Sequence, residues 1–268
     1  MQTNQQPLVS VMIPYYNCGK YIAETIASVK AQHYPHIEII IVDDGSDVVE
    51  AAVLTELMQQ HPDIRLIRQE NQGVSAARNQ AAAHASGRYY LFLDADDMLL
   101  PDYLSATVAV LESRAEIKLV YTQAEFFDAE NGPWKLPAYE SLRKLLEGNH
   151  IPVTSLHRAE DFHRIGGFDN TLHTHEDWDL WIRMLEHGGH ALCLERVLFR
   201  YRRRRDRSSV TNQLMSGKNC MKESWQNVYI KNSSLFCRHG LSFYDLINQV
   251  SHSRKKSRFR RWLARLKK

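Results

Sequence analysis

At 268 residues, 44% of them hydrophobic and 10% aromatic, the chain is long enough to bury the core of one large globular domain and an appendage. Its formal net charge of +3 is too small to suggest a nucleic-acid-binding protein, and no apolar run approaches the roughly 20 residues that cross a bilayer. Four scattered cysteines without a CxxC pair argue against a zinc site or a disulfide framework, and the polar start lacks the apolar stretch of a signal peptide. We therefore expect a cytosolic protein, or one bound to a membrane without crossing it.

Short apolar runs and helical spacings alternate over residues 8–121. The predicted strands lie at residues 8–13, 37–42, 64–67, 89–93 and 117–121. The predicted helices lie between them, at residues 22–29, 49–57, 74–85 and 104–111. Such alternation implies an α/β fold with a mostly parallel sheet, right-handed crossovers and a Rossmann-like nucleotide-binding half. Neither GxGxxG nor GxxxxGK(S/T) occurs, which leaves dinucleotide and P-loop chemistry without support.

The periodicity fades over residues 122–175, where Gly, Pro, Asn and His become frequent. We expect a loop-rich, mixed region there, which is the usual place for variable substrate contacts. A helix follows from Asp177, with one apolar face formed by Trp178, Trp181, Ile182 and Leu185. The helical spacing of the two tryptophans favours core packing over stacking on a sugar. No internal repeat or low-complexity linker interrupts residues 1 to about 215, so they are expected to form one domain.

The strongest chemical signal is in residues 89–97, where an apolar strand ends in the three carboxylates Asp94, Asp96 and Asp97. Buried parallel strands of α/β proteins present their chemistry at their carboxyl ends. Three acids so close together repel one another unless a positive group lies between them, and hard oxygen ligands suit Mg²⁺ or Mn²⁺. The alternative from these residues alone is a loop of helix-capping aspartates before Pro101.

Six motifs occur together in one order along the chain. They are VSVMIPYYN (9–17), IIIVDDGS (39–46), NQGVSAARN (71–79), LDADD (93–97), GGFD (166–169) and EDW (176–178). Over roughly residues 8–205 the chain therefore resembles the inverting glycosyltransferases of family 2, which have the GT-A fold. The resemblance implies a nucleotide-sugar half at about 8–121 and an acceptor half at about 122–215. We expect residues 216–268 to form a helical, basic C-terminal extension.

The resemblance implies a base pocket at the ends of the first two strands, made by Pro14, Tyr16 and Asp44. Tyr16 would stack on a pyrimidine ring, which is worth about 1–3 kcal/mol per base, and Asp44 would accept from the ring N–H. Arg78 would bind the diphosphate or support the carboxylates, since a fork of charged donors suits phosphate oxygens. The structural alternatives for Tyr16, Asp44 and Arg78 are a tyrosine at the rim of the core, a helix cap and a surface arginine, respectively.

The DxD element of the family corresponds to Asp94-Ala95-Asp96. The resemblance implies that Asp96 ligates Mn²⁺ or Mg²⁺ and that Asp94 reaches the ribose, the metal or its waters. Few protein ligands are needed, because the diphosphate supplies the others. The metal would neutralise charge that develops on the departing nucleoside diphosphate. Asp97 is expected to cap the next helix.

Inverting transfer also needs a base that takes the proton of the acceptor hydroxyl. The resemblance assigns this role to Asp177, at a helix N-terminus that helps to keep a carboxylate ionised, with Glu176 orienting the acceptor or the base. From the residues alone, the alternative is that both are ordinary first-turn acids. The turn at residues 166–169 is expected to line the acceptor side. His173 and His175 lie nearby, and we do not expect them to bind a metal.

Two segments are strongly basic. In residues 200–207, RYRRRRDR, we expect Arg204 or Arg205 to close over the diphosphate, where the family often carries a His or Arg; a solvated charge run is the alternative. Residues 251–268 hold nine Lys or Arg and no acid, with a narrow apolar face at Phe259, Trp262, Leu263 and Leu266. That pattern favours an amphipathic helix bound to anionic lipid, with RNA binding or a disordered tail as alternatives.

The sequence therefore predicts a metal-dependent inverting glycosyltransferase. It would move a sugar from a nucleotide-sugar donor, with UDP favoured, to a hydroxyl of a glycan or lipid-linked acceptor in surface polysaccharide biosynthesis. No nucleic-acid partner is expected, and the expected location is the cytoplasmic face of a membrane. The alternatives are a nucleotidyltransferase, which also uses metal-bound acids on such a half-domain, and a non-catalytic, membrane-associated subunit that binds glycan or nucleotide.

Overall fold

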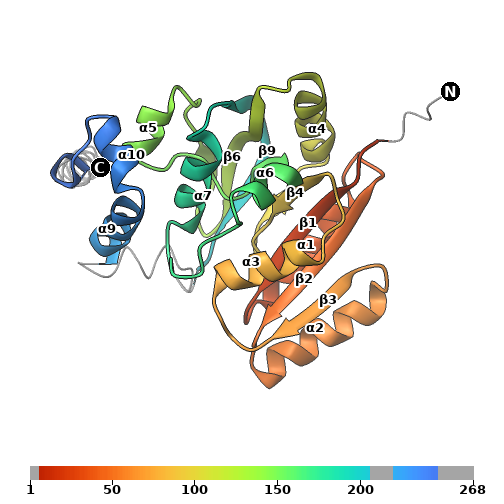
Figure 1. The fold of residues 1–268 in the computed structure, drawn as a ribbon. Coiled ribbons are helices and arrows are strands. Elements are labelled where there is room, and N and C mark those ends of the chain that lie inside the picture. Colours follow the sequence, from red (N-terminus) through yellow and green to blue (C-terminus); the bar gives the residue numbers. More distant parts are fainter. Residues whose placement is uncertain (1–5, 206–219, 247–268) are drawn as a thin grey trace, which may run out of the picture.

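A computed structural model of the chain describes residues 6–205 and 220–246 (Figure 1). The strands are β1 (Val9–Tyr15), β2 (Ile37–Asp44), β3 (Arg65–Gln69), β4 (Tyr89–Phe92), β5 (Met98–Leu99), β6 (Ile117–Asp128), β7 (Gly132–Trp134), β8 (Leu156–Arg158) and β9 (His190–Arg203). The helices are α1 (Gly19–Lys30), α2 (Val48–Gln60), α3 (Val74–Ala83), α4 (Tyr103–Ser113), α5 (Leu142–Leu146), α6 (Ala159–Arg164), α7 (Glu176–Leu185), α9 (Cys220–Lys231) and α10 (Ser233–Arg238).

The strands form one sheet in the order β3-β2-β1-β4-β8-β6-β9-β5, with β7 paired to β6. The first four strands are parallel, as the alternation of strands and helices predicts. Among the described residues, each antiparallel pairing involves β5, β7 or β8. The predicted α/β fold with a mostly parallel sheet and flanking helices is confirmed.

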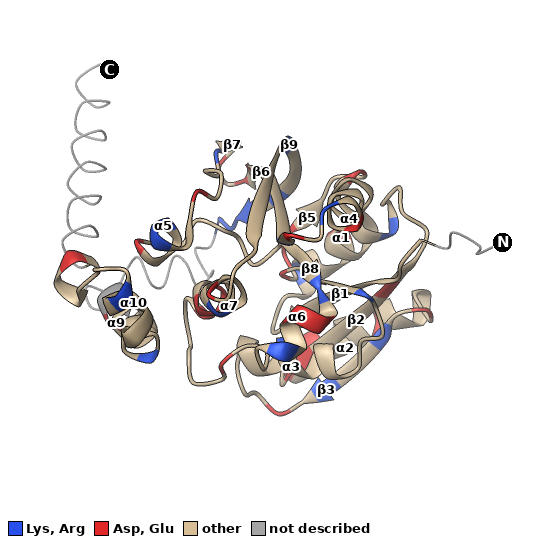
Figure 2. Ribbon diagram, turned by 45° about the horizontal axis from the view of Figure 1, so that its top comes forward, with Lys and Arg blue, Asp and Glu red and all other residues tan. Residues whose placement is uncertain are grey.

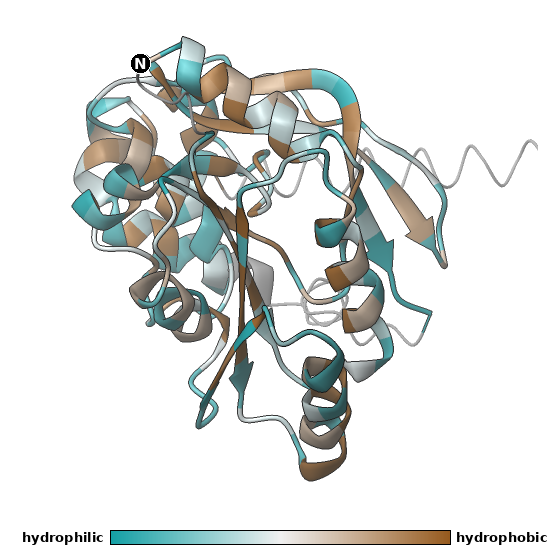
Figure 3. Cartoon of the chain, turned by 90° about the vertical axis from the view of Figure 1, so that its right-hand side faces the viewer, coloured by the Kyte–Doolittle hydropathy of each residue, from teal (hydrophilic) through white to brown (hydrophobic). Residues whose placement is uncertain are grey.

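Burial explains why β1, β2 and β4 read as continuous apolar runs rather than as alternating ones. Nearly every residue of these three strands is buried, as expected for parallel strands covered on both faces. The outer strand β3 is exposed at two of its five positions. Figure 3 shows the hydrophobic colour running along the central strands.

The helices follow the predicted spacings, but α2 differs in the face it buries. In α1 the residues Ile22, Ile26 and Val29 are all fully buried, as their spacing indicates. In α2 only Leu54 is buried, whereas Val49 and Val53 are 73% and 41% exposed. The helix lies beyond the edge strand β3 (Figure 1), where a single stripe of its surface meets the rest of the molecule.

The region 122–175 is more regular than the sequence predicts. Strand β6 continues to Asp128 instead of ending near residue 121, and the short elements β7, α5, β8 and α6 follow it. The continuation alternates between buried and half-buried residues, because one of its faces is only partly covered. It stays paired with β9 through a register shift near Gln123, which apolar content alone does not reveal.

Helix α7 is anchored in the core by the two tryptophans that its spacing predicts to be buried. Trp178 and Trp181 are both fully buried. Their indole N–H groups donate to the backbone oxygens of Leu145, at 2.7 Å, and Ile151, at 3.2 Å. Satisfying the polar edge of each ring makes full burial of these large side chains favourable. The core therefore fixes the axis of the helix that carries Glu176 and Asp177.

Residues 220–246 pack on the same core as α7. Val228 and Phe236 are fully buried, and the ring centroids of Trp225 and Trp178 lie 4.8 Å apart. In the view of Figure 2, basic and acidic positions are interspersed over the described helices. The predicted domain boundary near residue 215 and the basic amphipathic tail at 251–268 lie outside the described residues and stay predictions. Among the residues that are described, no helix is both long and apolar enough to cross a bilayer.

Candidate active site

The acidic motifs of the sequence meet at one edge of the sheet. Strands β1 and β2 are parallel and in register up to the pair Tyr15 and Asp43, and β4 runs parallel on the other side of β1. Their carboxyl ends therefore bring the Asp43-Asp44-Gly45-Ser46 turn and the Asp94-Ala95-Asp96 element to the same rim. This rim is where α/β sheets bind their ligands.

The loops after β1 and β2 are fastened to each other beside Tyr16. The side-chain oxygen of Asn17 accepts from the backbone N–H of Asp47 at 2.9 Å, and the N–H of Asn17 donates to the hydroxyl of Ser46 at 3.0 Å. Tyr16 is 53% exposed between these contacts, so its ring is open to a stacking partner. Pro14 lies within β1, opposite Val42 of β2.

Asp44 is buried and organises the loop that leads into α3. Its Oδ1 accepts from the Gln69 side chain at 2.7 Å and from the Gln72 N–H at 2.9 Å, and its Oδ2 accepts from the Gly73 N–H at 2.9 Å. An ionised carboxylate has about four acceptor positions, so three donors leave one for a ligand. The cap of α2 is Asp47, and not Asp44.

Gly45 is required by the geometry of this turn. Its φ of +73° lies in the left-handed region, and a Cβ there would stand 2.6 Å from the backbone nitrogen of Asn71. A side chain at this position would push apart the two loops that Asp44 holds together.

Arg78 joins the two halves of the site. From α3 its Nη2 donates to Oδ1 of Asp94 at 2.8 Å, and its Nη1 donates to Oε1 of Glu176, at the start of α7, at 2.6 Å. The side chain is only 3% exposed, and its guanidinium carbon lies 5.3 Å from the ring centre of Phe168. Burial alone would lower the pKa of Arg78, but the two facing carboxylates raise it above its ordinary value. Of the two predicted roles, this geometry favours support of the carboxylates over contact with a diphosphate.

Asp96 is paired with one arginine of the basic cluster. Its Oδ2 accepts from Nε of Arg204 at 2.6 Å, and its backbone oxygen accepts from Nε of Arg202 at 2.8 Å. Burial raises the pKa of Asp96, whereas Arg204 lowers it. Arg205 instead contacts Asp128 at 3.1 Å through a side chain that is 78% exposed. The structure thus brings Arg204 to the DxD element and directs Arg205 elsewhere.

Asp97 does not cap a helix, and that prediction is wrong. The carboxylate is buried, and its Oδ1 accepts from the backbone N–H of Arg202 at 2.9 Å. Burial raises the pKa of Asp97 well above its usual range, and the neighbouring charges of Asp96 and Asp94 add to that rise. The physical reason is that β5 follows directly and pairs with β9, which draws Asp97 into the sheet before α4 begins.

Asp177 is held in a form suited to a base. Its Oδ2 accepts from the side-chain N–H of Asn149 at 2.9 Å, and its Oδ1 accepts from the backbone N–H of Trp178 at 2.8 Å. Burial, followed by the charge of Glu176, raises the pKa of Asp177 to about 7, against the lowering effect of Arg78. The sequence does not identify Asn149, since it lies in the irregular segment between α5 and β8, where no motif marks it.

The turn at residues 166–169 is attached to α3 through the neighbour of Arg78. The side chain of Asn79 donates to the backbone oxygen of Phe168 at 2.8 Å and accepts from its N–H at 2.9 Å. Gly167 approaches so closely that a Cβ would lie 2.6 Å from Oδ1 of Asn79. The turn at residues 166–169 is therefore fixed to α3.

The donor set of the site fits a cation shared with a ligand better than one held by protein alone. Within the described part of the chain, no group of three or more His, Cys, Asp or Glu side chains gathers around one point. Asp94 and Asp96 each give one oxygen to an arginine, and Asp94 is 34% exposed. Burial, with a smaller contribution from the charge of Asp94, raises the pKa of Asp96. A divalent cation that takes most of its ligands from a diphosphate suits such a pair.

Comparison with known proteins decides the family. The model of glycosyl transferase family 2 matches residues 10–165, which is more than half of the chain. The chain belongs to glycosyl transferase family 2. The family predicted from the six motifs is confirmed.

Relatives from several bacteria share this family's sequence pattern. The chondroitin synthase of Escherichia coli is 31% identical over 202 residues, which are 72% of this chain but 29% of that protein. The hyaluronan synthase of Pasteurella multocida is 28% identical over 94% of this chain and 26% of its own length. TuaG of Bacillus subtilis, named as a glycosyltransferase of teichuronic acid biosynthesis, is 31% identical over 83% of this chain and 88% of its own length. The chain thus spans less than a third of the two synthases.

Solved structures of this family's fold support the architecture. S. aureus TarS in complex with UDP-GlcNAc matches with a TM-score of 0.67 and 19% identity, over 83% of this chain and 66% of that chain. The mannosyltransferase PcManGT from Pyrobaculum calidifontis, in complex with GDP-Man and Mn²⁺, matches with a TM-score of 0.57 and 17% identity, over 92% and 74% of the two chains. The predicted GT-A fold is confirmed.

The hydrogen bond from Asn149 gives a prediction about pH. If Asp177 must be ionised to act, kcat/KM rises with pH through about 7, where the carboxyl loses its proton, and is level above it. Asn149→Asp replaces the hydrogen-bond donor with a carboxylate of the same shape, whose negative charge disfavours ionisation of Asp177. The rise in kcat/KM should therefore shift to a higher pH, by about one unit or more. The matched control is Asn131→Asp at an exposed position, and an unshifted profile in Asn149→Asp would contradict the role of Asp177.

Proposed function

We propose that the chain is an inverting glycosyltransferase that moves a sugar from a UDP-linked donor to a hydroxyl of a growing glycan or lipid-linked acceptor in surface polysaccharide biosynthesis. One observation supports this most strongly: Arg78 ties the DxD carboxylate Asp94 to Glu176, beside the base-like Asp177. The names of the relatives point to polysaccharide products, and TarS, a structural neighbour, is known in complex with UDP-GlcNAc.

On the donor side, the base and the diphosphate of a nucleotide sugar each have matching groups. The exposed ring of Tyr16 would stack on the base, and the remaining acceptor position of Asp44 would meet a ring N–H. Asp96 and Asp94 would hold Mn²⁺ or Mg²⁺ together with the diphosphate. When bound, the cation would neutralise charge on the leaving nucleoside diphosphate. Arg204 is already beside Asp96 and would add a donor for the phosphate oxygens.

On the acceptor side, the contacts of Glu176 and Asp177 support different roles for the two acids. Glu176 is paired with Arg78 at 2.6 Å, so its carboxylate is already engaged in an ion pair. Asp177 has a pKa of about 7, close to a neutral working pH, which suits a general base. Asp177 would therefore take the proton of the acceptor hydroxyl as its oxygen attacks the anomeric carbon. Glu176 would hold Arg78, and through it the geometry of the donor side.

The first test measures the reaction itself. Wild-type protein, offered a panel of nucleotide sugars with a glycan acceptor, is expected to release nucleoside diphosphate; release of pyrophosphate would indicate nucleotidyl transfer instead. Asp177→Asn keeps the shape of the side chain but removes the base, so transfer should fall by about 10²–10⁴-fold while donor binding is retained. Asp63→Asn, at an exposed position, is the control. Unchanged turnover in Asp177→Asn would refute the assignment of the base.

The second test concerns the cation. Chelation should abolish transfer, and added Mn²⁺ should restore it. Asp96→Asn removes the charge of a metal ligand, so the affinity for Mn²⁺ in the presence of UDP should fall by about tenfold or more. This affinity is measured from the electron paramagnetic resonance signal of free Mn²⁺. Asp102→Asn, a surface carboxylate paired with Arg196 and His33, is the matched control. Full activity in the presence of chelator would rule out metal dependence.

A further inference from the structure

Helix α9 contacts Thr174 and His175, the two residues that precede Glu176 and Asp177. The hydroxyl of Ser224 receives hydrogen bonds from the Thr174 hydroxyl and from Nδ1 of His175, at 2.5 Å in the second case, and donates to the backbone oxygen of Thr174 at 3.2 Å. The indole N–H of Trp225 donates to Nε2 of His175 at 3.2 Å. Both ring nitrogens of His175 are thus hydrogen-bonded to α9. Because an indole N–H can only donate, Nε2 is the acceptor and the proton of the neutral ring lies on Nδ1.

The backbone of His175 shows why these contacts matter. Its φ of +59° lies in the left-handed region, which is unfavourable for a residue other than glycine and persists only where the surroundings hold it. Glu176 and Asp177 follow directly, so this unusual conformation sets the direction in which α7 starts. Release of His175 would let the first turn of α7 change direction.

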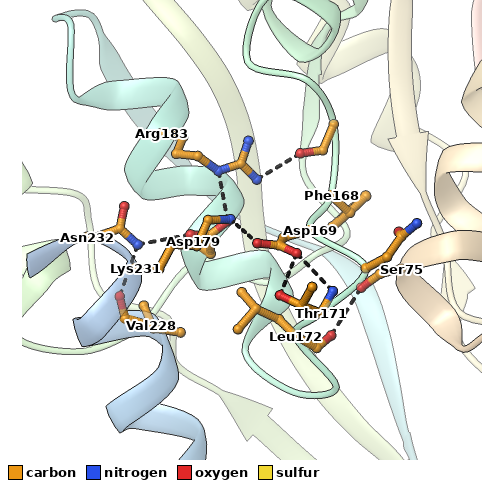
Figure 4. Close-up of polar contacts among 12 residues, drawn as sticks. Ser75, Phe168, Asp169, Thr171, Leu172, Asp179, Arg183, Val228, Lys231 and Asn232 are labelled. Carbon is orange, nitrogen blue, oxygen red and sulfur yellow. Dashed lines mark hydrogen bonds and ion pairs between the residues drawn. The ribbon is translucent and has the colours of Figure 1, made fainter.

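A second set of contacts holds the same helix from the side of α9. Asp179 is fully buried; its Oδ2 accepts from Lys231 at 2.7 Å and its Oδ1 from the Asn232 side chain at 2.9 Å. Figure 4 shows these side chains pointing from the end of α9 toward α7, with Arg183 on the same carboxylate. Side chains two residues apart on a helix are rotated by about 200°, so they point to nearly opposite faces. Asp179 therefore faces α9, whereas Asp177 faces Asn149.

Lys231 also contacts the turn at residues 166–169. Its ammonium also contacts Oδ2 of Asp169 at 2.6 Å, and Asp169 further accepts from Thr171 (Figure 4). Burial opposes ionisation of Asp169, but hydrogen bonds from Lys231 and Thr171 lower its pKa to about 2. A single lysine therefore links the end of α9 to both the 166–169 turn and α7.

We propose that α9 and Asn232 are positioning elements for the proposed glycosyl transfer: Ser224 and Trp225 fix His175, Lys231 and Asn232 fix Asp179, and together they aim Asp177 at the acceptor hydroxyl. This role rests on the proposed function. It predicts that the segment is needed for the chemical step and not for donor binding, because the base pocket lies on β1 and β2, on the far side of Arg78.

The test uses the full chain with Trp225→Phe, which keeps an aromatic ring against Trp178 and loses the N–H, and with Ser224→Ala. Gln226→Ala, at an exposed position of the same helix, is the control. The first two variants should lose about 10- to 100-fold in kcat, since small misplacements of a reacting group cost that much. UDP affinity should stay close to that of Gln226→Ala, and the melting temperature should fall by only a few degrees, the cost of one or two buried hydrogen bonds. The pH at which kcat/KM rises should be lower in Trp225→Phe and Ser224→Ala than in the control. An Asp177 that is less firmly held is more exposed to water, which lowers its pKa.

Hydrogen exchange of the backbone amides of residues 176–179 supplies a readout that does not need turnover. It should be faster in Trp225→Phe and Ser224→Ala than in the control. If exchange and kcat in both variants equal those of Gln226→Ala, the positioning role is overturned; a parallel fall in UDP affinity or a general loss of stability overturns it as well. If the wild type releases no nucleoside diphosphate from any donor, the proposed function fails, and the exchange rates still decide whether α9 holds the start of α7.

Discussion

The site depends on one buried guanidinium. Arg78 lies between Asp94, which follows a central strand, and Glu176, which begins α7. Glu176 is 98 residues from Arg78 along the chain. Burying an arginine without partners would be costly, and so would burying either acid near the others. Each of the three charges is acceptable there because the other two are present. The end of β4 and the start of α7 are therefore joined by an interaction that neither segment can satisfy alone.

The ion pair with Arg78 also makes the surroundings of the neighbouring acids Glu176 and Asp177 different. Glu176 and Asp177 are adjacent in sequence and share a helix N-terminus, yet only Glu176 meets Arg78 directly. Asp177 has the neutral donors Asn149 and its own helix backbone, and burial, followed by the charge of Glu176, raises its pKa to about 7. Different surroundings thus give one acid a structural task and the other a pKa suited to proton transfer. A similar contrast exists between Arg204, which meets Asp96, and the neighbouring Arg205, which meets Asp128.

Local patterns predict the fold well where burial is uniform. The runs that become β1, β2 and β4 are buried along almost their whole length, and the spacing of Ile22, Ile26 and Val29 gives α1. Prediction fails where a long-range contact decides. The continuation of β6 depends on its pairing with β9, and the place of Asp97 depends on the pairing of β5 with the same strand. Neither partner is visible from the local sequence.

The family motifs locate the acids of the site, but they do not give the groups that hold them. Asn149 reaches Asp177 from 28 residues away, and nothing in the composition of residues 122–175 marks it. Arg204 and Arg205 follow directly after β9, so the choice between them depends on the path of the chain beyond the strand, which the sequence does not reveal. Contacts from residues 220–246 to α7 likewise come from tertiary packing that no motif encodes.

The central claim, that Arg78 and Glu176 are energetically coupled across the two halves, is tested most directly by a double-mutant cycle. Free energies of unfolding would be measured by denaturation for Arg78→Met, Glu176→Gln and the double variant. Arg78→Met leaves Asp94 and Glu176 without their shared cation and should cost about 3–5 kcal/mol, whereas Glu176→Gln keeps the pair of Arg78 with Asp94 and should cost less. The double variant should cost less than the sum of the two single changes. The exposed pair of Arg114 and Glu116 serves as the matched cycle and should show little coupling. Additive costs for Arg78→Met and Glu176→Gln would contradict this coupling.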